Sequence, residues 1–529
     1  MFLLLQRRPA RPAPPVRELS WPLCLNDRPT KLFVSPSYQT AVQRMFALGH
    51  ELSQTPSHKF DLAHMRVLLT ALEYPERRFP SVLIAGTNGK GSTAATLASI
   101  LQASGLRTGL YTSPHLMRIN ERIQINGEAI PDDKFALLHD MVERTAERLV
   151  EDGDLPWHPS FFEMLTAIAF EHFATSKVEI AVLEVGMGGR LDATNVVEPR
   201  VSVITDVALD HQKFLGNTIT EIAREKVGII RPGGVVVTLP QTPEANDVIG
   251  NAILELGATA VNAVPYVPPL SPASPRYSGA NTEDESSSAL DEGPSTALAA
   301  ERRKNTAHGG SRGLGQSDGP APKGRKTLVA GYPLEVMGQR ILVETSLVGR
   351  HQLRNIALAI ASAEELAKQG CPLTAKSIEN GIRGTRWPGR FQVIPASDEA
   401  SEFVLDVAHN PAGAWALRSG LSSYYEDRRI IFVFGAMRDK AIAEMCEILF
   451  PLSESVVATC AENPRSATPE EVRNAAARTH TEIDIRPDIP SALARARELA
   501  REDGIVVVTG SIYVVGEAMR VLGVSVDGK

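Results

Sequence analysis

The sequence contains few cysteines and no strong excess of charge of either sign. Its four cysteines are scattered over 529 residues, and no two of them form a CxxC pair. This distribution indicates a reducing compartment and argues against a disulfide framework or a zinc site. Because the formal net charge is −7 at pH 7, no global basic field attracts nucleic acid or a membrane surface.

A long apolar run is also absent. No segment approaches the roughly 18 apolar residues that a membrane-spanning helix requires. The N-terminus, MFLLLQRRPARPAPP, has a short apolar start before its arginines and prolines, whereas a signal peptide places basic residues before a longer apolar core. We therefore expect a cytoplasmic protein without membrane partners, and a disordered extension over residues 1–37.

Short apolar runs alternate with helical stretches along most of the chain. The first series is SVLIAG, RTGLYTS, VEIAVLEVG, RVSVITDVA and GGVVVTL, and a second begins near Pro388 with FVLDVAHN, RIIFVFGAM, SVVATCAE and GIVVVTGSIY. Such alternation is typical of parallel sheets wrapped by helices. We predict an α/β fold: a P-loop-type parallel-sheet ATPase domain over residues 38–386, then a smaller Rossmann-like α/β domain over 387–529.

One long segment interrupts the first domain. Residues 265–326 are rich in proline, serine, glycine and charge. A segment of this composition cannot bury enough apolar area to offset the entropy of ordering it. We predict a disordered insertion.

The stretch SVLIAGTNGKGSTAATLASIL joins a predicted strand to a predicted helix through a glycine-rich loop. Backbone N–H groups at a helix start bind phosphate oxygens, and a lysine adds positive charge. The spacing is two residues shorter than in GxxxxGK[ST], which counts against motor proteins and GTPases. The alternative is a glycine-rich turn with an exposed lysine. We favour a loop that binds nucleotide phosphates through Gly86, Thr87, Asn88, Gly89, Lys90, Gly91 and Ser92.

Two further strands end in acidic or imidazole side chains. Glu184 ends the strand AVLEVG, and Asp210 and His211 follow the strand VITDVA. We favour Glu184 as a Mg²⁺ ligand, because a carboxylate at this edge of the sheet, beside a phosphate loop, is where such a ligand belongs. The alternative is that Glu184 caps the loop or helix after its strand. For His211 the residue pattern alone favours an ordinary hydrogen-bonded histidine, and for Lys226 a surface lysine paired with Glu221 or Glu225.

These segments together resemble the folylpolyglutamate synthase/dihydrofolate synthase family of the Mur ligase superfamily. Further motifs match in the same order: YTSPHLMRINERIQING (111–127), HQLRN (351–355), PGRFQVI (388–394), LDVAHNPAGAWAL (405–417), FGAMRDK (434–440) and TGSIYVVGE (509–517). Cell-wall Mur ligases typically have Thr or Ser directly after GTNGK, whereas the folate branch has glycine followed by Ser or Thr. Gly91 therefore points to the folate branch.

The resemblance implies an ATP-dependent ligase that joins L-glutamate to the terminal carboxylate of a folate, and also acts on dihydropteroate. The carboxylate attacks the γ-phosphate to form an acyl phosphate, which the glutamate amine then displaces. Chemistry of this kind depends on positioning and on neutralising charge. The implied partners are ATP, Mg²⁺ at two sites, glutamate and folate or dihydropteroate, and we expect a monomer.

The resemblance also assigns roles to residues. Lys90, Lys226, Asp406 and His409 would act nearest the reacting groups, with Asn355, Arg390 and Asp406 contacting ATP. Mg²⁺ would be held by Ser113, Glu184, His211 and Lys226, the last of these as a carbamylated lysine. The acid substrate and glutamate would lie near Phe161, Phe162, Glu163, Arg190, Asp192 and Ser511. A cell-wall Mur-type ligase and a non-catalytic nucleotide-binding module are the alternatives.

Overall fold

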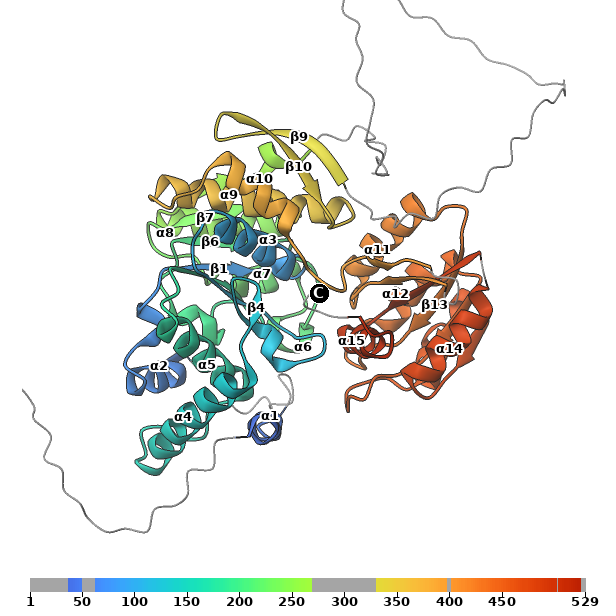
Figure 1. The fold of residues 1–529 in the computed structure, drawn as a ribbon, viewed down its shortest axis with the longest axis horizontal. Coiled ribbons are helices and arrows are strands. Elements are labelled where there is room, and N and C mark those ends of the chain that lie inside the picture. The colour runs from blue at the N-terminus through green and yellow to red at the C-terminus, as the bar shows by residue number, and fades with distance from the viewer. Residues whose placement is uncertain (1–36, 50–61, 269–329, 397–400, 502, 525–529) are drawn as a thin grey trace, which may run out of the picture.

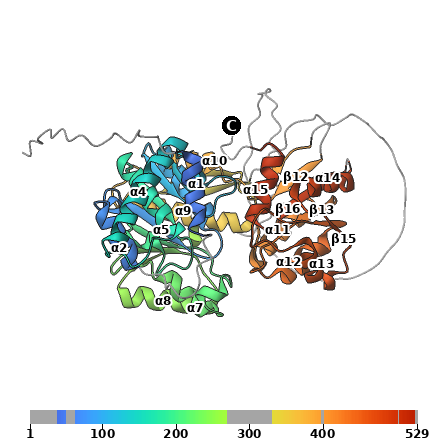
Figure 2. The ribbon, with the colours of Figure 1, turned by 90° about the horizontal axis from the view of Figure 1, so that it is seen from below.

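The computed structural model describes residues 37–49, 62–268, 330–396, 401–501 and 503–524. It has two lobes side by side, one coloured blue to yellow and the other orange to red (Figures 1 and 2). Each lobe is built on its own sheet. We call them the N-terminal domain and the C-terminal domain. The α/β class and the order of the two sheets confirm the prediction from sequence.

The sheet of the N-terminal domain has eight strands in the order β4-β3-β2-β5-β1-β6-β7-β8. The strands from β2 to β8 in this order run parallel, and the β3–β4 hairpin pairs antiparallel at one edge. Their bounds are β1 Ser81–Ala85, β2 Thr108–Tyr111, β3 Ile123–Ile125, β4 Glu128–Ala129, β5 Ile180–Glu184, β6 Val201–Ile204, β7 Val235–Thr238 and β8 Thr259–Asn262.

Helices cover both faces of this sheet. In β1 the side chains alternate, so that Val82 and Ile84 face one helical layer and Leu83 and Ala85 face the other. One layer contains α3 (Lys90–Ala103), α9 (Arg350–Lys368) and α10 (Ala375–Gly384). The other contains α1 (Tyr38–Ala47), α2 (Leu62–Ala71), α4 (Asp132–Glu151), α5 (Phe161–Thr175), α7 (Ile219–Val227) and α8 (Pro243–Leu256). Burial on both faces explains why these strands are almost entirely apolar.

An antiparallel hairpin, β9 (Ala330–Val336) and β10 (Gln339–Thr345), packs beside α10. The short 3-10 helix η4 (Val264–Tyr266) packs against α9. Pro265 and Tyr266 were predicted to belong to the insertion, and η4 instead places them in the folded domain. The rest of the predicted insertion from residue 269, and residues 1–36 of the predicted N-terminal extension, lie outside the described residues.

The C-terminal domain has six strands in the order β11-β12-β16-β13-β14-β15, all parallel except β11. They are β11 Gln392–Ile394, β12 Glu402–Leu405, β13 Arg429–Phe434, β14 Ser455–Ala458, β15 Ile483–Ile485 and β16 Gly504–Thr509. One face is covered by α11 (Pro411–Tyr424), α12 (Ile442–Leu449) and α13 (Pro469–Ala475), the other by α14 (Ile489–Ala500) and α15 (Ile512–Val521). Residues 385–391 connect α10 to β11.

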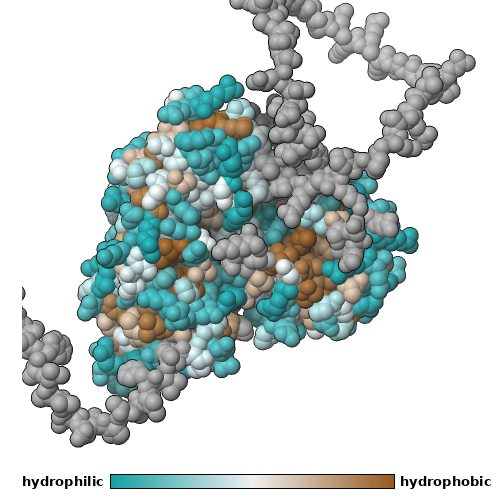
Figure 3. Space-filling model, in the orientation of Figure 1, coloured by the Kyte–Doolittle hydropathy of each residue, from teal (hydrophilic) through white to brown (hydrophobic). Residues whose placement is uncertain are grey.

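The face in Figure 3 carries mostly hydrophilic residues, with hydrophobic residues in scattered groups. Scattered apolar side chains of this kind are usual on globular proteins. Among the helices of the described residues, none is both long and apolar enough to cross a membrane.

Candidate active site

A cavity of about 1260 Å³ is lined by residues of both domains. Strands β1, β5 and β6 run parallel, so their carboxyl ends meet at one edge of the sheet. The glycine-rich loop follows β1, Glu184 ends β5, and Asp210 follows β6. In the C-terminal domain Asp406 follows β12 and faces the same cavity. Ligands of open α/β sheets bind at such edges.

The start of the glycine-rich loop is fixed by the segment after β6. The amides of Thr87 and Asn88 donate to the carbonyl of Asp206, at 2.8 and 3.1 Å. The Thr87 hydroxyl exchanges two hydrogen bonds of 3.0 Å with the backbone of Ala208. These groups hold the loop in place. The amides at the start of α3, beginning at Lys90, have no intrahelical acceptor and face the cavity as candidate phosphate donors.

Close approaches favour glycine at Gly86, Gly89 and Gly91 of the loop, and the last two of these bear on the site. Gly89 has φ +87°, and a Cβ there would lie 2.1 Å from Oδ1 of the predicted ATP contact Asn355. A Cβ on Gly91 would lie 2.9 Å from the ring of Trp387 and 3.3 Å from Oε2 of Glu184. The glycine after the lysine, which pointed to the folate branch, therefore makes room for the connection between the domains.

Two lysines point at one carbonyl oxygen of this loop. Lys90 Nζ donates to the Gly86 carbonyl at 3.1 Å and Lys226 Nζ donates to it at 2.7 Å. Lys226 is only 3% exposed. Its predicted alternative, a surface pair with Glu221 or Glu225, is wrong, because Glu225 pairs with Arg190 at 2.9 Å and Glu221 caps the start of α7.

Burial lowers the pKa of Lys226 to about 7, and the neighbouring charge of Lys90 acts in the same direction. A large share of this amine is therefore neutral at physiological pH. A neutral amine is the form that reacts as a nucleophile. The position thus has the chemistry that carbamylation requires.

Glu184 and Ser113 form an oxygen-rich corner of the cavity. The Ser113 amide donates to Glu184 Oε2 at 3.1 Å, and both residues line the cavity. Burial raises the pKa of Glu184, and the charge of Lys90 opposes this rise. In the described part of the chain no three His, Cys, Asp or Glu residues are placed to hold a metal ion. Mg²⁺ fits this corner nevertheless, because it is usually bound by one or two carboxylates, waters and substrate phosphates.

His211 begins the short helix α6 (Gln212–Leu215) in a left-handed conformation, with φ +51°. Its ring Nε2 lies 4.0 Å from Oδ2 of Asp210. Burial lowers the pKa of His211 to about 3, which Asp210 only partly offsets. The imidazole is therefore neutral and has a lone pair for a ligand.

Asp406 and Arg390 form the facing half of the cavity. The amides of Phe391 and Ala408 each donate to the Asp406 carboxylate at 2.9 Å. Burial raises the pKa of Asp406, and the charge of Arg390 opposes this rise. Burial also lowers the pKa of Arg390, whereas the negative charges of Asp406 and Glu184 raise it. Arg390 thus lies within electrostatic reach of carboxylates from both domains.

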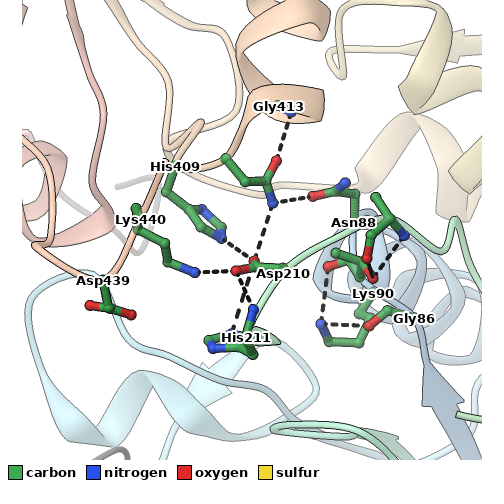
Figure 4. Close-up of polar contacts among 12 residues, drawn as sticks. Gly86, Asn88, Lys90, Asp210, His211, His409, Gly413, Asp439 and Lys440 are labelled. Atoms are coloured by element: carbon green, nitrogen blue, oxygen red, sulfur yellow. Dashed lines mark hydrogen bonds and ion pairs between the residues drawn. The ribbon is translucent and has the colours of Figure 1, made fainter. Parts of the chain in front are cut away.

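His409 extends from the C-terminal domain towards Asp210 (Figure 4). His409 Nδ1 contacts the Val407 carbonyl at 2.9 Å, and its Nε2 lies 3.7 Å from Asp210 Oδ2. Asn410 Nδ2 donates to Asn88 Oδ1 at 3.0 Å. The structure therefore brings the predicted catalytic residues of both domains into one site.

The residues predicted to contact the acid substrate do not all face the cavity. Phe162 and Glu163 line it. Phe161 instead packs in the core and stacks on Phe46, with ring centroids 5.8 Å apart. Because neighbouring residues on a helix lie about 100° apart, the first two residues of α5 face different ways. The prediction that Phe161 borders the substrate is therefore corrected.

Arg190, Asp192 and Ser511 line the cavity, and each also has a structural role. Arg190 pairs with Glu225. Asp192 accepts hydrogen bonds from the amides of Met187 and Thr194, each at 3.0 Å. The Ser511 hydroxyl accepts from the Tyr513 amide at 3.2 Å and caps α15.

Sequence reasoning missed several residues of the cavity wall. His64 lies between Glu163 Oε1, at 3.1 Å from Nδ1, and the Trp157 carbonyl, at 3.0 Å from Nε2. The rings of His64 and Trp157 stack with centroids 5.5 Å apart. Lys440 reaches the site from a loop of the C-terminal domain. The FGAMRDK motif was the only signal for Lys440.

Comparisons with known proteins agree with this geometry. Residues 389–512 match the family model of the Mur ligase, glutamate ligase domain. The chain is 33% identical to folylpolyglutamate synthase of Lacticaseibacillus casei over 473 residues, covering 89% of this chain and 95% of that protein. It is 31% identical to dihydrofolate synthase/folylpolyglutamate synthase of Bacillus subtilis, covering 87% and 94%. The Mycobacterium tuberculosis folylpolyglutamate synthase complexed with ADP superposes with a TM-score of 0.72 at 27% identity, covering 92% and 99%.

The glycine-rich loop faces the glutamate ligase domain across a shared cavity, and with the relatives this arrangement defines an ATP-dependent ligase of the Mur type. Within that class, relatives above 30% identity match nearly their whole length. The chain belongs to the folylpolyglutamate synthase/dihydrofolate synthase family.

Proposed function

We propose that this protein adds L-glutamate to the terminal carboxylate of folates, with conversion of ATP to ADP and phosphate, and that it also acts on dihydropteroate. The observation that carries the proposal is the cavity in which the α3 amides, Lys90 and Glu184 face Arg390 and Asp406. Relatives named for both activities support the choice of substrates. A solved folylpolyglutamate synthase–AMPPCP–folate complex, with a TM-score of 0.66 at 30% identity, supports a folate and a nucleotide as ligands.

The residues suit a two-step reaction. A carboxylate oxygen of the acid bonds to the γ-phosphorus and ADP leaves. The glutamate amine then attacks the acyl carbon, loses a proton, and phosphate leaves. The α3 amides and Lys90 would hold the phosphates, because two anions must meet in the first step. Asn355, Arg390 and Asp406 would orient the nucleotide from the other side, and His409 lies next to this junction.

Ser113, Glu184 and His211 would hold Mg²⁺, together with the phosphate oxygens. When bound, the metal neutralises phosphate charge so that a carboxylate can approach. The neutral imidazole and the oxygens of the Ser113–Glu184 corner are suitable donors. Phosphate oxygens would supply the oxygen ligands that Mg²⁺ prefers.

Lys226 would act as a carbamate. Its amine is buried, lies 2.7 Å from the Gly86 carbonyl and has a pKa of about 7. A carbamate would convert this cation into an oxygen donor for a second metal ion. Both halves of the site come from one chain, so the protein would act as a monomer.

An ADP-release assay tests the proposed function. Dihydropteroate, a tetrahydrofolate and a UDP-muramyl peptide are each supplied with and without L-glutamate, and Lys90→Ala serves as the inactive control. We expect ADP release only when glutamate accompanies one of the pterin acids. If the UDP-muramyl peptide is the only acid that supports ADP release, the protein is instead a cell-wall ligase. If glutamate stimulates ADP release with none of the three acids, both assignments are refuted.

A further inference from the structure

A buried ion pair joins the two domains beside the phosphate loop. Lys440 Nζ lies 2.6 Å from Oδ1 of Asp210, and the two side chains are 8% and 9% exposed. Figure 4 shows Lys440 extending from the C-terminal domain to this carboxylate. The pair therefore joins a lysine of one domain to a carboxylate of the other, at a place largely shielded from water.

Lys440 is held in place before it reaches across the interface. It lies in the turn after β13, where its amide donates to the Met437 carbonyl at 3.1 Å. Asp439 accepts two hydrogen bonds from Arg465, at 2.8 and 2.9 Å, which fix the same turn. A pre-positioned lysine loses less freedom when it forms an ion pair, so the pair has a stronger orienting effect.

A second polar contact reaches the same place. Asn410 Nδ2 donates to Asn88 of the phosphate loop and lies 3.3 Å from Asp210 Oδ2. Its Oδ1 accepts from the Gly413 amide at 2.8 Å, which caps α11. The start of α11 and the turn of Lys440 therefore both dock on the segment between β6 and α6.

The domains also touch near the connecting segment, and that contact is of another kind. A Cβ on Gly516 of α15 would lie 2.0 Å from the Leu116 carbonyl. Leu116 and Met117 of the N-terminal domain pack against the apolar core of the C-terminal domain. Close packing of this kind is costly to separate, whereas the polar groups of the Lys440 contact find replacement partners in water.

We propose that the Lys440–Asp210 ion pair is a latch that positions the C-terminal domain over the phosphate loop. Lys440 is then a positioning residue and not a substrate ligand. Its charge is already matched by a carboxylate, whereas the hydrogen bonds of Lys90 and Lys226 go to backbone carbonyl oxygens, those of Gly86 and Thr87. The inference rests on the proposed function, because ATP would contact groups of both domains only when they are docked.

The test compares Lys440→Met, Lys440→Arg, Asp210→Asn and the double variant Lys440→Met/Asp210→Asn in the full chain. Arg438→Met is the matched control, because Arg438 lies two residues away and pairs with Glu471 inside the C-terminal domain. Steady-state kinetics separate kcat from the KM for ATP. Hydrogen exchange with a non-hydrolysable ATP analogue measures protection of residues 205–216 and 434–441, and thermal melting confirms that each variant is folded.

For the latch we expect Lys440→Met and Asp210→Asn each to raise the KM for ATP by about 10-fold or more, since apparent affinity falls with the docked fraction. Saturating ATP should return kcat to within a few fold of wild type. The analogue should protect both segments less in these variants. Lys440→Arg should keep most of the affinity, and the double variant should be no worse than either single change.

Two results would overturn the proposal. Loss of kcat at saturating ATP in Lys440→Met but not in Asp210→Asn would make Lys440 a substrate ligand. Unchanged KM and unchanged protection in both single variants would leave the pair without a positioning role. The exchange measurement contains neither folate nor glutamate, so failure of the proposed ligase activity would be seen separately, in the ADP-release assay of the wild-type protein.

Discussion

The two domains build their halves of the active site by different means. The N-terminal half concentrates charge: Lys90 and Lys226 converge on one carbonyl, and Glu184 is buried beside them with a single amide donor. The C-terminal half relies on backbone contacts, because Asp406 accepts two amides and His409 is held by the Val407 carbonyl. Charge in the first half would act on the reacting phosphate. Fixed geometry in the second would orient the nucleotide.

If this comparison is right, changes in the first half should affect the rate most. Replacing Lys226 with alanine would leave the Gly86 carbonyl without this donor and remove the proposed carbamate. We expect kcat to fall by about 100-fold or more, the range seen when an electrostatic stabiliser is lost. The KM for ATP should change little, because the α3 amides remain. Steady-state kinetics with Arg224→Ala, an exposed residue of the same helix, as control would measure this.

The carbamate itself has an independent readout. Protein equilibrated with ¹³C-bicarbonate should show a carbamate resonance that is present in Arg224→Ala and missing in Lys226→Ala. Acetate should partly restore the rate of Lys226→Ala by placing oxygen donors in the gap. A kcat near that of the wild type, or a carbamate signal that survives the alanine substitution, would remove Lys226 from the proposed mechanism.

A change in the second half should affect nucleotide affinity first. Asp406→Asn preserves the shape of the side chain. However, its NH₂ group is a donor and would replace one of the two oxygens that accept from the amides of Phe391 and Ala408. Loss of one hydrogen bond to a charged group is worth about 1.5–3 kcal/mol, so we expect the KM for ATP to rise by roughly 10-fold or more. The kcat should fall less than in Lys226→Ala. Asp427→Asn, an exposed change in the same domain, is the control, and the reverse pattern of KM and kcat would contradict the comparison.

A smaller effect concerns the wall of the cavity in the N-terminal domain, away from the charged groups compared above. His158 Nε2 lies 3.5 Å from Glu143 Oε2. This pair raises the pKa of His158 and lowers the pKa of Glu143. The folded state thus holds the histidine proton more tightly than the unfolded chain does. The stabilisation from His158 is complete below about pH 6.5 and is lost as pH rises through the raised pKa.

Glu143 sets the lower pH limit of the stabilisation by this ion pair. The contribution of Glu143 to the free energy of unfolding is fully present above about pH 4.5 and is lost as pH falls through its lowered pKa. We expect His158→Gln to lower Tm between these limits and to have little effect at pH values above the raised pKa of His158. The control is His480→Asn, an exposed histidine in a left-handed turn. A difference in Tm that does not vary with pH would exclude the ion pair as its cause.

The smallest effect is expected for the predicted insertion, which supplies no residue to either half of the predicted site. Replacing residues 269–326 with a short Gly/Ser bridge should keep turnover within a few fold of wild type. The reason is compositional: the segment lacks hydrophobic periodicity and lies far in sequence from every predicted site residue. Turnover and Tm of the deletion variant measure this. Loss of folding would show that the segment contributes to the core.

The sequence predicted those parts of the molecule in which local pattern and global fold agree. Apolar runs located β1, β5, β6 and the main strands of the second sheet, and the parallel arrangement then placed Glu184 and Asp210 at one edge. The three-residue strands β3 and β15 were missed, because so short a run carries no usable periodicity. Spacing alone could not show that Lys226 is buried, since its partner is a carbonyl 140 residues earlier.

Contacts between the domains were the least predictable. Lys440 and Asp210 are 230 positions apart, and each reads as an ordinary polar residue in its own segment. Phe161 and Phe162 look alike in sequence, and only the start of α5 at Phe161 decides which ring faces the cavity. In each of these cases the outcome depends on tertiary packing and not on local preference.

The close approach of Trp387 to Gly91 gives the protein an optical probe of its own. This indole lies in the segment that connects the domains, against the first turn of α3. Trp157 and Trp415 are more exposed, at 42% and 58%, so a soluble quencher will suppress their emission first. The fourth tryptophan, Trp21, lies outside the described residues and would be replaced by phenylalanine. The fluorescence that then survives the quencher reports on the glycine-rich loop and the connecting segment together, without any attached dye.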